Sequence, residues 1–177
     1  MQKRTGLVQV YTGDGKGKTT AAVGCAVRAL ACGLRVGCVY FCKNPGKWEY
    51  GESIILKKNG ADIFYFAKRH PRFCKDVTKA DVRKECVKAL AFIKNIFKKN
   101  KYDLLVLDEI CVCAREGVLT VKEVLGIVNS KPRNLELILT GRGAPKKIME
   151  KADYVSRITK LKHPYDKGIK GRKGIEY

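Results

Sequence analysis

Three segments near the start of the chain restrict its fold more than any other feature of the sequence. An apolar run at residues 7–11 is followed by the glycine-rich stretch TGDGKGKTT, from Thr12 to Thr20, and then by a segment with helical character. A buried strand that passes through glycines directly into a helix is the first unit of a parallel sheet with helices packed on it. The start of the chain therefore favours an α/β fold.

The rest of the chain repeats this alternation of short apolar runs with longer amphipathic stretches. Candidate strands lie at residues 7–11, 35–41, 62–66, 103–108, 135–140 and 153–161, and candidate helices at 18–32, 78–100, 120–129 and 145–151. Thr78 or Asp81 is expected to cap the second of these helices. The pattern predicts a three-layer α/β fold with a mostly parallel, doubly wound sheet.

Length and cysteine content restrict the organisation of the chain. A length of 177 residues fits one domain, so we expect a single domain over residues 1–177, with 162–177 as a basic C-terminal tail. This tail is expected either to be a mobile end or to fold over a ligand. The eight cysteines include no C-x-x-C pair, which favours free thiols and a cytoplasmic protein. No apolar run approaches the ~18 residues of a membrane helix, so we expect no membrane association.

The chain is strongly basic. Its 37 Lys and Arg residues outnumber 17 Asp and Glu residues, which gives a formal net charge of +20. Such an excess attracts polyanions, among them ATP, a carboxylate-rich substrate and nucleic acid. Composition alone favours a solvated lysine-rich surface, and the sequence contains no nucleic-acid recognition motif to accompany the charge.

The glycine-rich stretch is typical of a P-loop, the turn whose backbone N–H groups hold nucleotide phosphates at a helix N-terminus. Its candidate ligand-binding residues are Gly13, Asp14, Gly15, Lys16, Gly17, Lys18, Thr19 and Thr20. Lys18 is expected to neutralise phosphate, and the Thr19 hydroxyl to reach Mg²⁺. In the usual spacing the first glycine would be residue 12, but Thr12 stands there and the glycine comes one residue later.

Two further motifs follow candidate strands. Asp108 and Glu109 end the run DLLVLDE, and carboxylates at that position are suited to holding Mg²⁺. The turn TGRG at 140–143 places Arg142 at the same edge of the sheet, where its guanidinium is expected to bind phosphate. The fold is thus predicted to be of the P-loop nucleotide-binding type.

Taken together, these stretches resemble the ATP:corrinoid adenosyltransferase family, of the cob(I)alamin or cob(I)yrinic acid a,c-diamide type. The resemblance lies in VYTGDGKGKTTAA at 10–22, GE at 51–52, DLLVLDE at 103–109, TGRGAP at 140–145, ADYVSRI at 152–158 and the tail from 162 to 177. The glycine shifted by one residue is the pattern of that family.

The resemblance implies an enzyme of cobalamin biosynthesis or salvage that transfers the 5′-deoxyadenosyl group of ATP to the Co(I) of a corrinoid and releases triphosphate. ATP is then a co-substrate, bound with Mg²⁺ or Mn²⁺, and its triphosphate lies in the loop in an orientation reversed from that of P-loop hydrolases. The family also suggests a homodimer and a flavodoxin-like or flavin reductant.

By matching positions, the resemblance assigns roles to residues. Gly13 to Thr19 would surround the triphosphate, Thr19 and Glu109 would hold the metal with Asp108 as a further candidate, and Arg28 and Arg142 would add positive charge. Lys18 and Arg142 are the expected catalytic residues. Arg28 is expected to face inward from the first helix, and a solvated helix arginine is the alternative.

Corrinoid contacts are expected in the loop at 67–77. Phe73 would pack against the lower corrin face and so favour four-coordinate Co(II), with an ordinary loop anchor as the alternative. His70 is expected to be a polar loop residue, with ligation of cobalt as the alternative. Family members often carry an N-terminal extension over the site, whereas about six residues precede the first strand here, so we expect closure to come from elsewhere or from a partner.

Two other functions fit the P-loop. A basic P-loop ATPase that binds nucleic acid would explain the charge and the lysines at 94–101 and 146–151. A small-molecule kinase would transfer the γ-phosphate and leave ADP. Release of intact triphosphate distinguishes the adenosyltransferase from both.

Overall fold

Six parallel strands form one sheet in the computed structural model, which describes residues 5–43, 51–67 and 77–176. The strands are β1 (Val8–Thr12), β2 (Val36–Phe41), β3 (Asp62–Phe66), β4 (Leu104–Asp108), β5 (Glu136–Thr140) and β6 (Tyr154–Arg157). Their order across the sheet is β3-β2-β4-β5-β1-β6, and every neighbouring pair runs parallel. The predicted α/β fold is confirmed, and these strands are wholly rather than mostly parallel.

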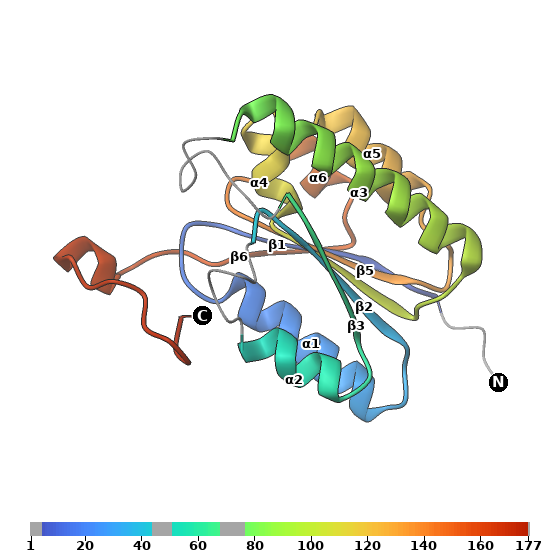
Figure 1. Ribbon diagram of the computed structural model, residues 1–177, viewed down its shortest axis with the longest axis horizontal. Helices are drawn as coiled ribbons and strands as arrows, with labels where there is room; N and C mark the ends of the chain where they lie inside the picture. Colours follow the sequence, from blue (N-terminus) through green and yellow to red (C-terminus); the bar gives the residue numbers. More distant parts are fainter. Residues whose placement is uncertain (1–4, 44–50, 68–76, 177) are drawn as a thin grey trace.

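Helices cover both faces of this sheet, as Figure 1 shows. On one face lie α1 (Lys18–Ala31) and α2 (Gly51–Lys58), and on the other α3 (Lys79–Lys99), α4 (Ile110–Arg115), α5 (Val121–Asn129) and α6 (Lys146–Glu150). A short 3-10 helix, η1 (Pro164–Lys167), lies in the tail. The arrangement is the three-layer architecture that the alternating sequence pattern predicts.

Each face of the sheet has its own apolar core. Side chains alternate across a strand, so Leu105 and Leu107 of β4 pack under α3, whereas Leu104 and Val106 face α1. The residues that α1 buries against the sheet are small: Ala22, Ala26 and Ala29 are all nearly inaccessible. Small side chains let this helix lie close to the strands, which holds the loop that precedes it against the edge of the sheet.

The predicted cap of α3 is confirmed. Thr78 is the N-cap, its hydroxyl oxygen accepts a 3.2 Å hydrogen bond from the Asp81 N–H, and the Asp81 carboxylate accepts one of 3.0 Å from the Thr78 N–H. This reciprocal pair satisfies two N–H groups that a bare helix terminus leaves without partners. Thr120 and Glu123 form the same arrangement at α5.

Some element boundaries differ from the predictions. The strand predicted over 153–161 ends at Arg157, because its partner β1 ends at Thr12, where the chain turns into the glycine-rich loop. The helices α2 and α4 were not predicted, since eight and six residues are too few to establish a helical period.

Two further observations concern the cysteines and membranes. The seven cysteines in the described ranges are free thiols, and four of them, Cys38, Cys86, Cys111 and Cys113, are buried. No helix in the described part of the chain is long and apolar enough to span a membrane.

Candidate active site

The glycine-rich loop lies at the carboxyl edge of the sheet, between β1 and α1. Gly17 is the N-cap of α1, with φ at 127° and no side chain bonded to the helix end, and the first turn of α1 contains no acidic residue. The N–H groups and the dipole of this 14-residue helix therefore face the loop and favour an anion there. The structure therefore places the predicted phosphate-binding residues around the N-terminus of α1.

Lys18 is buried at the start of the helix. Its ammonium donates a 2.6 Å hydrogen bond to the carbonyl of Gly15, within the loop itself. Burial lowers the pKa of this ammonium, and the positive charge of Arg142 adds to the effect. An incoming phosphate would supply the negative charge that the buried ammonium favours.

The shifted glycine has a structural reason. Thr12 is buried, and its hydroxyl accepts a 3.0 Å hydrogen bond from the N–H of Ala144, which ties the start of the loop to the turn after β5. Gly13 has φ at 105°, and a Cβ there would lie 2.3 Å from the carbonyl oxygen of Ile158. A hydroxyl is therefore needed at residue 12 and a glycine at residue 13.

Asp108 forms the centre of a hydrogen-bond network at the end of β4. It is fully buried, and its Oδ1 accepts hydrogen bonds from the hydroxyls of Thr19, at 3.0 Å, and Thr140, at 2.7 Å. The Thr140 oxygen in turn accepts a 3.0 Å bond from the N–H of Glu109. Since β5 lies between β4 and β1, Thr140 links the acids to the phosphate loop. The structure thus brings Thr19 and Asp108 together.

Glu109 begins α4 in a left-handed conformation, with φ at 65°. Burial and the charge of Asp108 raise the pKa of its carboxyl to about 7, against the opposing effect of Lys43, Lys18 and Arg142. Arg142 is an exposed residue in the turn after β5, near enough to Lys18 and Glu109 to influence the pKa of both groups. The structure therefore places Arg142 beside the loop, as expected.

Lys43 is a site residue that the sequence analysis missed. It follows β2, and its ammonium lies 2.8 Å from Asp108 Oδ2, 3.6 Å from Glu52 Oε1 and 4.9 Å from the centre of the Tyr40 ring. Burial alone would lower the pKa of this ammonium, but Asp108 outweighs burial and the pKa is raised. The sequence could have indicated Lys43, because it is a lysine two residues after a buried strand, at the same edge of the sheet as the acids.

Thr19 and Thr20, at the end of the glycine-rich stretch, and Glu109 border a cavity of about 450 Å³. Its lining comes from α1, the end of β2, the first turn of α2, the end of β4 and the C-terminal tail, and consists of Thr19, Thr20, Val23, Lys43, Gly51, Glu52, Glu109, Gly174, Ile175 and Glu176. Polar and charged side chains dominate this lining, which suits a charged ligand rather than an apolar one.

The chain after β6, from Ile158 to the tail, lies against the phosphate loop. The Ile158 carbonyl accepts a 2.8 Å bond from the Gly15 N–H, and Asp14 Oδ1 accepts a 3.1 Å bond from the Lys160 N–H. Lys16 does not turn into the loop, because its ammonium lies 3.1 Å from the Ile175 carbonyl oxygen and 3.2 Å from Glu176 Oε1. The chain end therefore forms one wall of the site.

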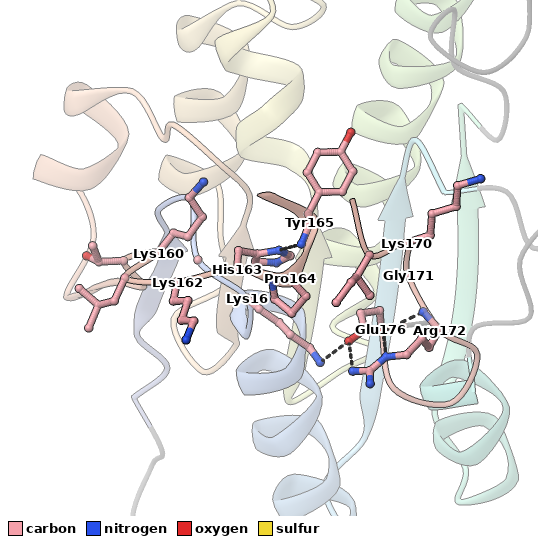
Figure 2. A pocket seen from close by; sticks show the side chains of 14 residues that line it. Lys16, Lys160, Lys162, His163, Pro164, Tyr165, Lys170, Gly171, Arg172 and Glu176 are labelled. Atoms are coloured by element: carbon pink, nitrogen blue, oxygen red, sulfur yellow. Dashed lines mark hydrogen bonds and ion pairs between the residues drawn. The ribbon is translucent and has the colours of Figure 1, made fainter. Parts of the chain in front are cut away.

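Figure 2 shows the second cavity, of about 610 Å³, that this tail encloses beside the loop. Basic side chains from both segments surround it, and Glu176 joins Lys16 to Arg172, whose guanidinium lies 3.0 Å from the Glu176 carboxylate. The tail lies beside the loop, and its folding over a ligand stays a prediction.

Arg28 is exposed and lines a separate cavity of about 570 Å³ with Tyr11, Cys25 and Tyr154. Its predicted part in binding ATP stays a prediction. Phe73 and His70 lie outside the described residues.

The sheet is parallel, and a glycine-rich loop joins β1 to a helix. Asp108 and Glu109 lie at the end of β4, two strands away from β1, and the Thr19 hydroxyl bonds Asp108. These features define a P-loop nucleotide-binding protein. Residues 4–177 match the model of the family described as ATP:corrinoid adenosyltransferase BtuR/CobO/CobP. The chain belongs to this family, whose members transfer an adenosyl group from ATP to a corrinoid.

Similar proteins bear the same name. The chain is 35% identical to a corrinoid adenosyltransferase of Escherichia coli K12, over 99% of this chain and 88% of that protein. It is 35% identical to the corrinoid adenosyltransferase CobA of Salmonella typhimurium, with the same coverage. It is 30% identical to a corrinoid adenosyltransferase of Pseudomonas aeruginosa, over 97% of this chain and 84% of the relative.

Proposed function

We propose that this adenosyltransferase binds the triphosphate of ATP in the loop from Gly13 to Thr20 and holds it as the leaving group while Co(I) of the corrinoid attacks the 5′ carbon. The observation that carries the proposal is that Thr19 and Thr20, at the end of the loop, and Glu109 line one cavity. A displacement at carbon needs no protein nucleophile, but it needs the leaving charge neutralised and the carbon held in line.

Lys18 and Arg142 would neutralise the departing triphosphate. The Lys18 ammonium already lies inside the loop, where it bonds the Gly15 carbonyl, and a phosphate oxygen would take over that hydrogen bond. Arg142 is exposed in the turn after β5, near Lys18 and Glu109, and its planar guanidinium can bind two oxygens at once. Both residues supply charge where charge develops on the leaving group.

The donor set at the end of β4 fits a divalent cation. Asp108, Glu109 and the Thr19 hydroxyl present oxygen atoms, which Mg²⁺ prefers, and Mn²⁺ accepts the same ligands. No group of three or more His, Cys, Asp and Glu side chains within the described ranges is arranged to hold a metal by itself. Nucleotide phosphates and water would therefore complete the coordination, and the cation would supply positive charge to the triphosphate.

Corrinoid binding and partners complete the proposal. Phe73 would lie against the lower corrin face, and replacing it with alanine should reduce activity from Co(II) more than activity from supplied Co(I). Equal losses from both starting states would contradict that role. A homodimer, a flavodoxin-like or flavin reductant, and a cytoplasmic location are further proposals that rest on the family resemblance.

The deciding experiment mixes the protein with Mg-ATP and cob(I)alamin without oxygen, follows the corrinoid spectrum and identifies the phosphate product. We expect a light-sensitive adenosylcorrinoid and one intact triphosphate per turnover. ADP that appears only with nucleic acid would indicate the basic ATPase, and γ-phosphate transfer to a small molecule would indicate a kinase.

A further inference from the structure

Lys43 lies between two carboxylates on different elements. Its ammonium is 2.8 Å from Asp108 Oδ2 and 3.6 Å from Glu52 Oε1, which α2 supplies in its first turn. The Lys43 side chain is 14% exposed and that of Glu52 is 23% exposed, whereas the Asp108 side chain is fully buried. The lysine therefore has a deep carboxylate partner and a shallower one nearer the opening of the cavity.

The deep partner is also a candidate metal ligand. Asp108 Oδ1 accepts the hydroxyls of Thr19 and Thr140, so Oδ2 is the oxygen on the side of Lys43. An ammonium 2.8 Å from that oxygen stands where a cation bound to it would stand. Lys43 and a divalent cation thus compete for one carboxylate oxygen.

Charge decides which ligand can displace the lysine. A bare divalent cation would bring two positive charges beside a buried ammonium, and such repulsion is strong away from bulk water. A metal–ATP complex carries net negative charge, so the same ammonium attracts it. Glu52 offers the displaced ammonium a second carboxylate, which avoids the cost of a buried charge without a partner.

We propose that Lys43 is a positioning residue that occupies the metal position at Asp108 in the ATP-free enzyme and turns to Glu52 when metal and ATP enter together. The divalent cation then binds only with nucleotide. The inference rests on the proposed role of Asp108 in holding the metal. It also gives a role to Glu52, part of the GE stretch of the sequence, which has no part in the proposed binding of ATP and metal.

The test measures the Mn²⁺ bound to the protein by equilibrium dialysis, with and without ATP, because ATP in solution binds Mn²⁺ by itself. Wild-type protein should bind Mn²⁺ weakly alone and tightly with ATP. Lys43→Met should bind Mn²⁺ without ATP at least about tenfold more tightly than wild type, because the competing charge is gone. Lys43→Arg should keep the wild-type behaviour, and Asp108→Asn added to Lys43→Met should abolish the gain.

Lys101 provides a matched control at the opposite edge of the sheet. Its ammonium lies 2.9 Å from Asp62 and 5.2 Å from the centre of the Tyr102 ring, which repeats the chemistry around Lys43 away from the site. Lys101→Met should leave Mn²⁺ binding unchanged. Glu52→Gln should leave binding without ATP weak and loosen binding with ATP severalfold, because the displaced ammonium loses its second carboxylate.

The outcomes separate this inference from the proposed function. If Lys43→Met binds Mn²⁺ no better than wild type without ATP, while both bind it with ATP, the inference is wrong and the metal site stands. If wild type fails to bind Mn²⁺ even with ATP, the metal site itself is wrong and the inference is rejected with it. A Glu52→Gln protein identical to wild type in both conditions would remove Glu52 from the proposal.

Discussion

The hydroxyl of Thr140 donates a 2.7 Å hydrogen bond to the buried Asp108 carboxylate and accepts one of 3.0 Å from the Glu109 N–H. One side chain of β5 thereby fixes the Asp108 carboxylate at the end of β4 and the backbone of Glu109, the residue that follows it. The geometry of the proposed metal site depends on a residue that does not itself have to touch the metal.

Thr140→Val keeps the shape of this residue and removes both hydrogen bonds. We expect the Mg²⁺ concentration for half-maximal activity to rise about 10- to 100-fold, as is typical when a ligand loses its orienting partner. The free energy of unfolding should fall by about 1–3 kcal/mol, because a buried carboxylate loses a donor. Activity titrations with Mg²⁺ and denaturant unfolding measure the two effects. Thr140→Ser should have a Mg²⁺ requirement and a free energy of unfolding close to those of wild type. An unchanged Mg²⁺ requirement in the valine variant would contradict the role of Thr140.

Gly13→Ala should damage both stability and ATP binding. Its φ of 105° is strained for any L side chain, and the new Cβ would lie 2.3 Å from the Ile158 carbonyl oxygen. We expect a loss of about 1–3 kcal/mol in unfolding free energy and weaker ATP binding by calorimetry. Gly24→Ala is the matched control, because Gly24 lies within α1 and its added Cβ meets nothing within 4 Å. This second variant should gain about 0.5–1 kcal/mol. Equal effects of the two substitutions would show that the contact with Ile158 does not matter.

The ion pair of Glu123 with Arg83 predicts a pH-dependent contribution to stability. The guanidinium of Arg83, 2.6 Å from the carboxylate, lowers the pKa of Glu123 from 4.5 to about 2, with hydrogen bonds from Thr120 in support. A carboxyl with a lowered pKa in the folded state stabilises the fold above its unfolded pKa and loses that effect as pH falls. The contribution should therefore be complete above about pH 5 and disappear between about pH 4.5 and pH 2.

Glu123→Gln tests this contribution, because glutamine retains the helix cap and removes the charge. The difference in Tm between the variant and wild type should be largest at pH 6–7 and shrink toward pH 3, with a loss of about 0.5–1 kcal/mol at neutral pH. The control is Glu85→Gln. Glu85 forms an exposed pair with Lys88 within α3, so this change should alter Tm little. A Tm difference that stays constant with pH would mean that the charge of Glu123 does not stabilise the fold.

Removal of residues 162–177 should weaken ATP binding while the rest of the chain stays folded. Within this segment the described residues are not buried, so the Tm should shift by only a few degrees. The tail nevertheless encloses the cavity beside the loop and holds Lys16 through Glu176, so KM for ATP should rise about tenfold. Circular dichroism and steady-state kinetics provide the two measurements. A truncated enzyme with unchanged KM would show that the tail is not a wall of the ATP site.

Local patterns were sufficient to predict much of this molecule. The glycines from 13 to 17 and the acids at 108 and 109 each follow a buried strand, and parallel strands bring their carboxyl ends to one edge. The capping pair Thr78 and Asp81 is equally local. These features depend on neighbours within a few residues, which is why the sequence is a good guide to them.

The features that were missed depend on long-range contacts. Lys43 meets Asp108 across 65 positions of sequence only because β2 and β4 are neighbours in the sheet. Ile158 binds Gly15 through a backbone hydrogen bond, which has no side-chain signature. The direction of the Arg28 side chain depends on how the whole helix is set against the sheet, and its predicted role stays a prediction. The predicted role of Phe73 remains a prediction.

The strand that carries the phosphate loop has both of its partners, β5 and β6, in the last third of the chain. During synthesis the loop leaves the ribosome early, yet β1 cannot enter the sheet until residues 136–157 are available to pair with it. The segment that contacts the loop, up to Glu176, is made later still. The ATP site therefore forms only after β5 and β6 have been made, and fragments released before that lack it.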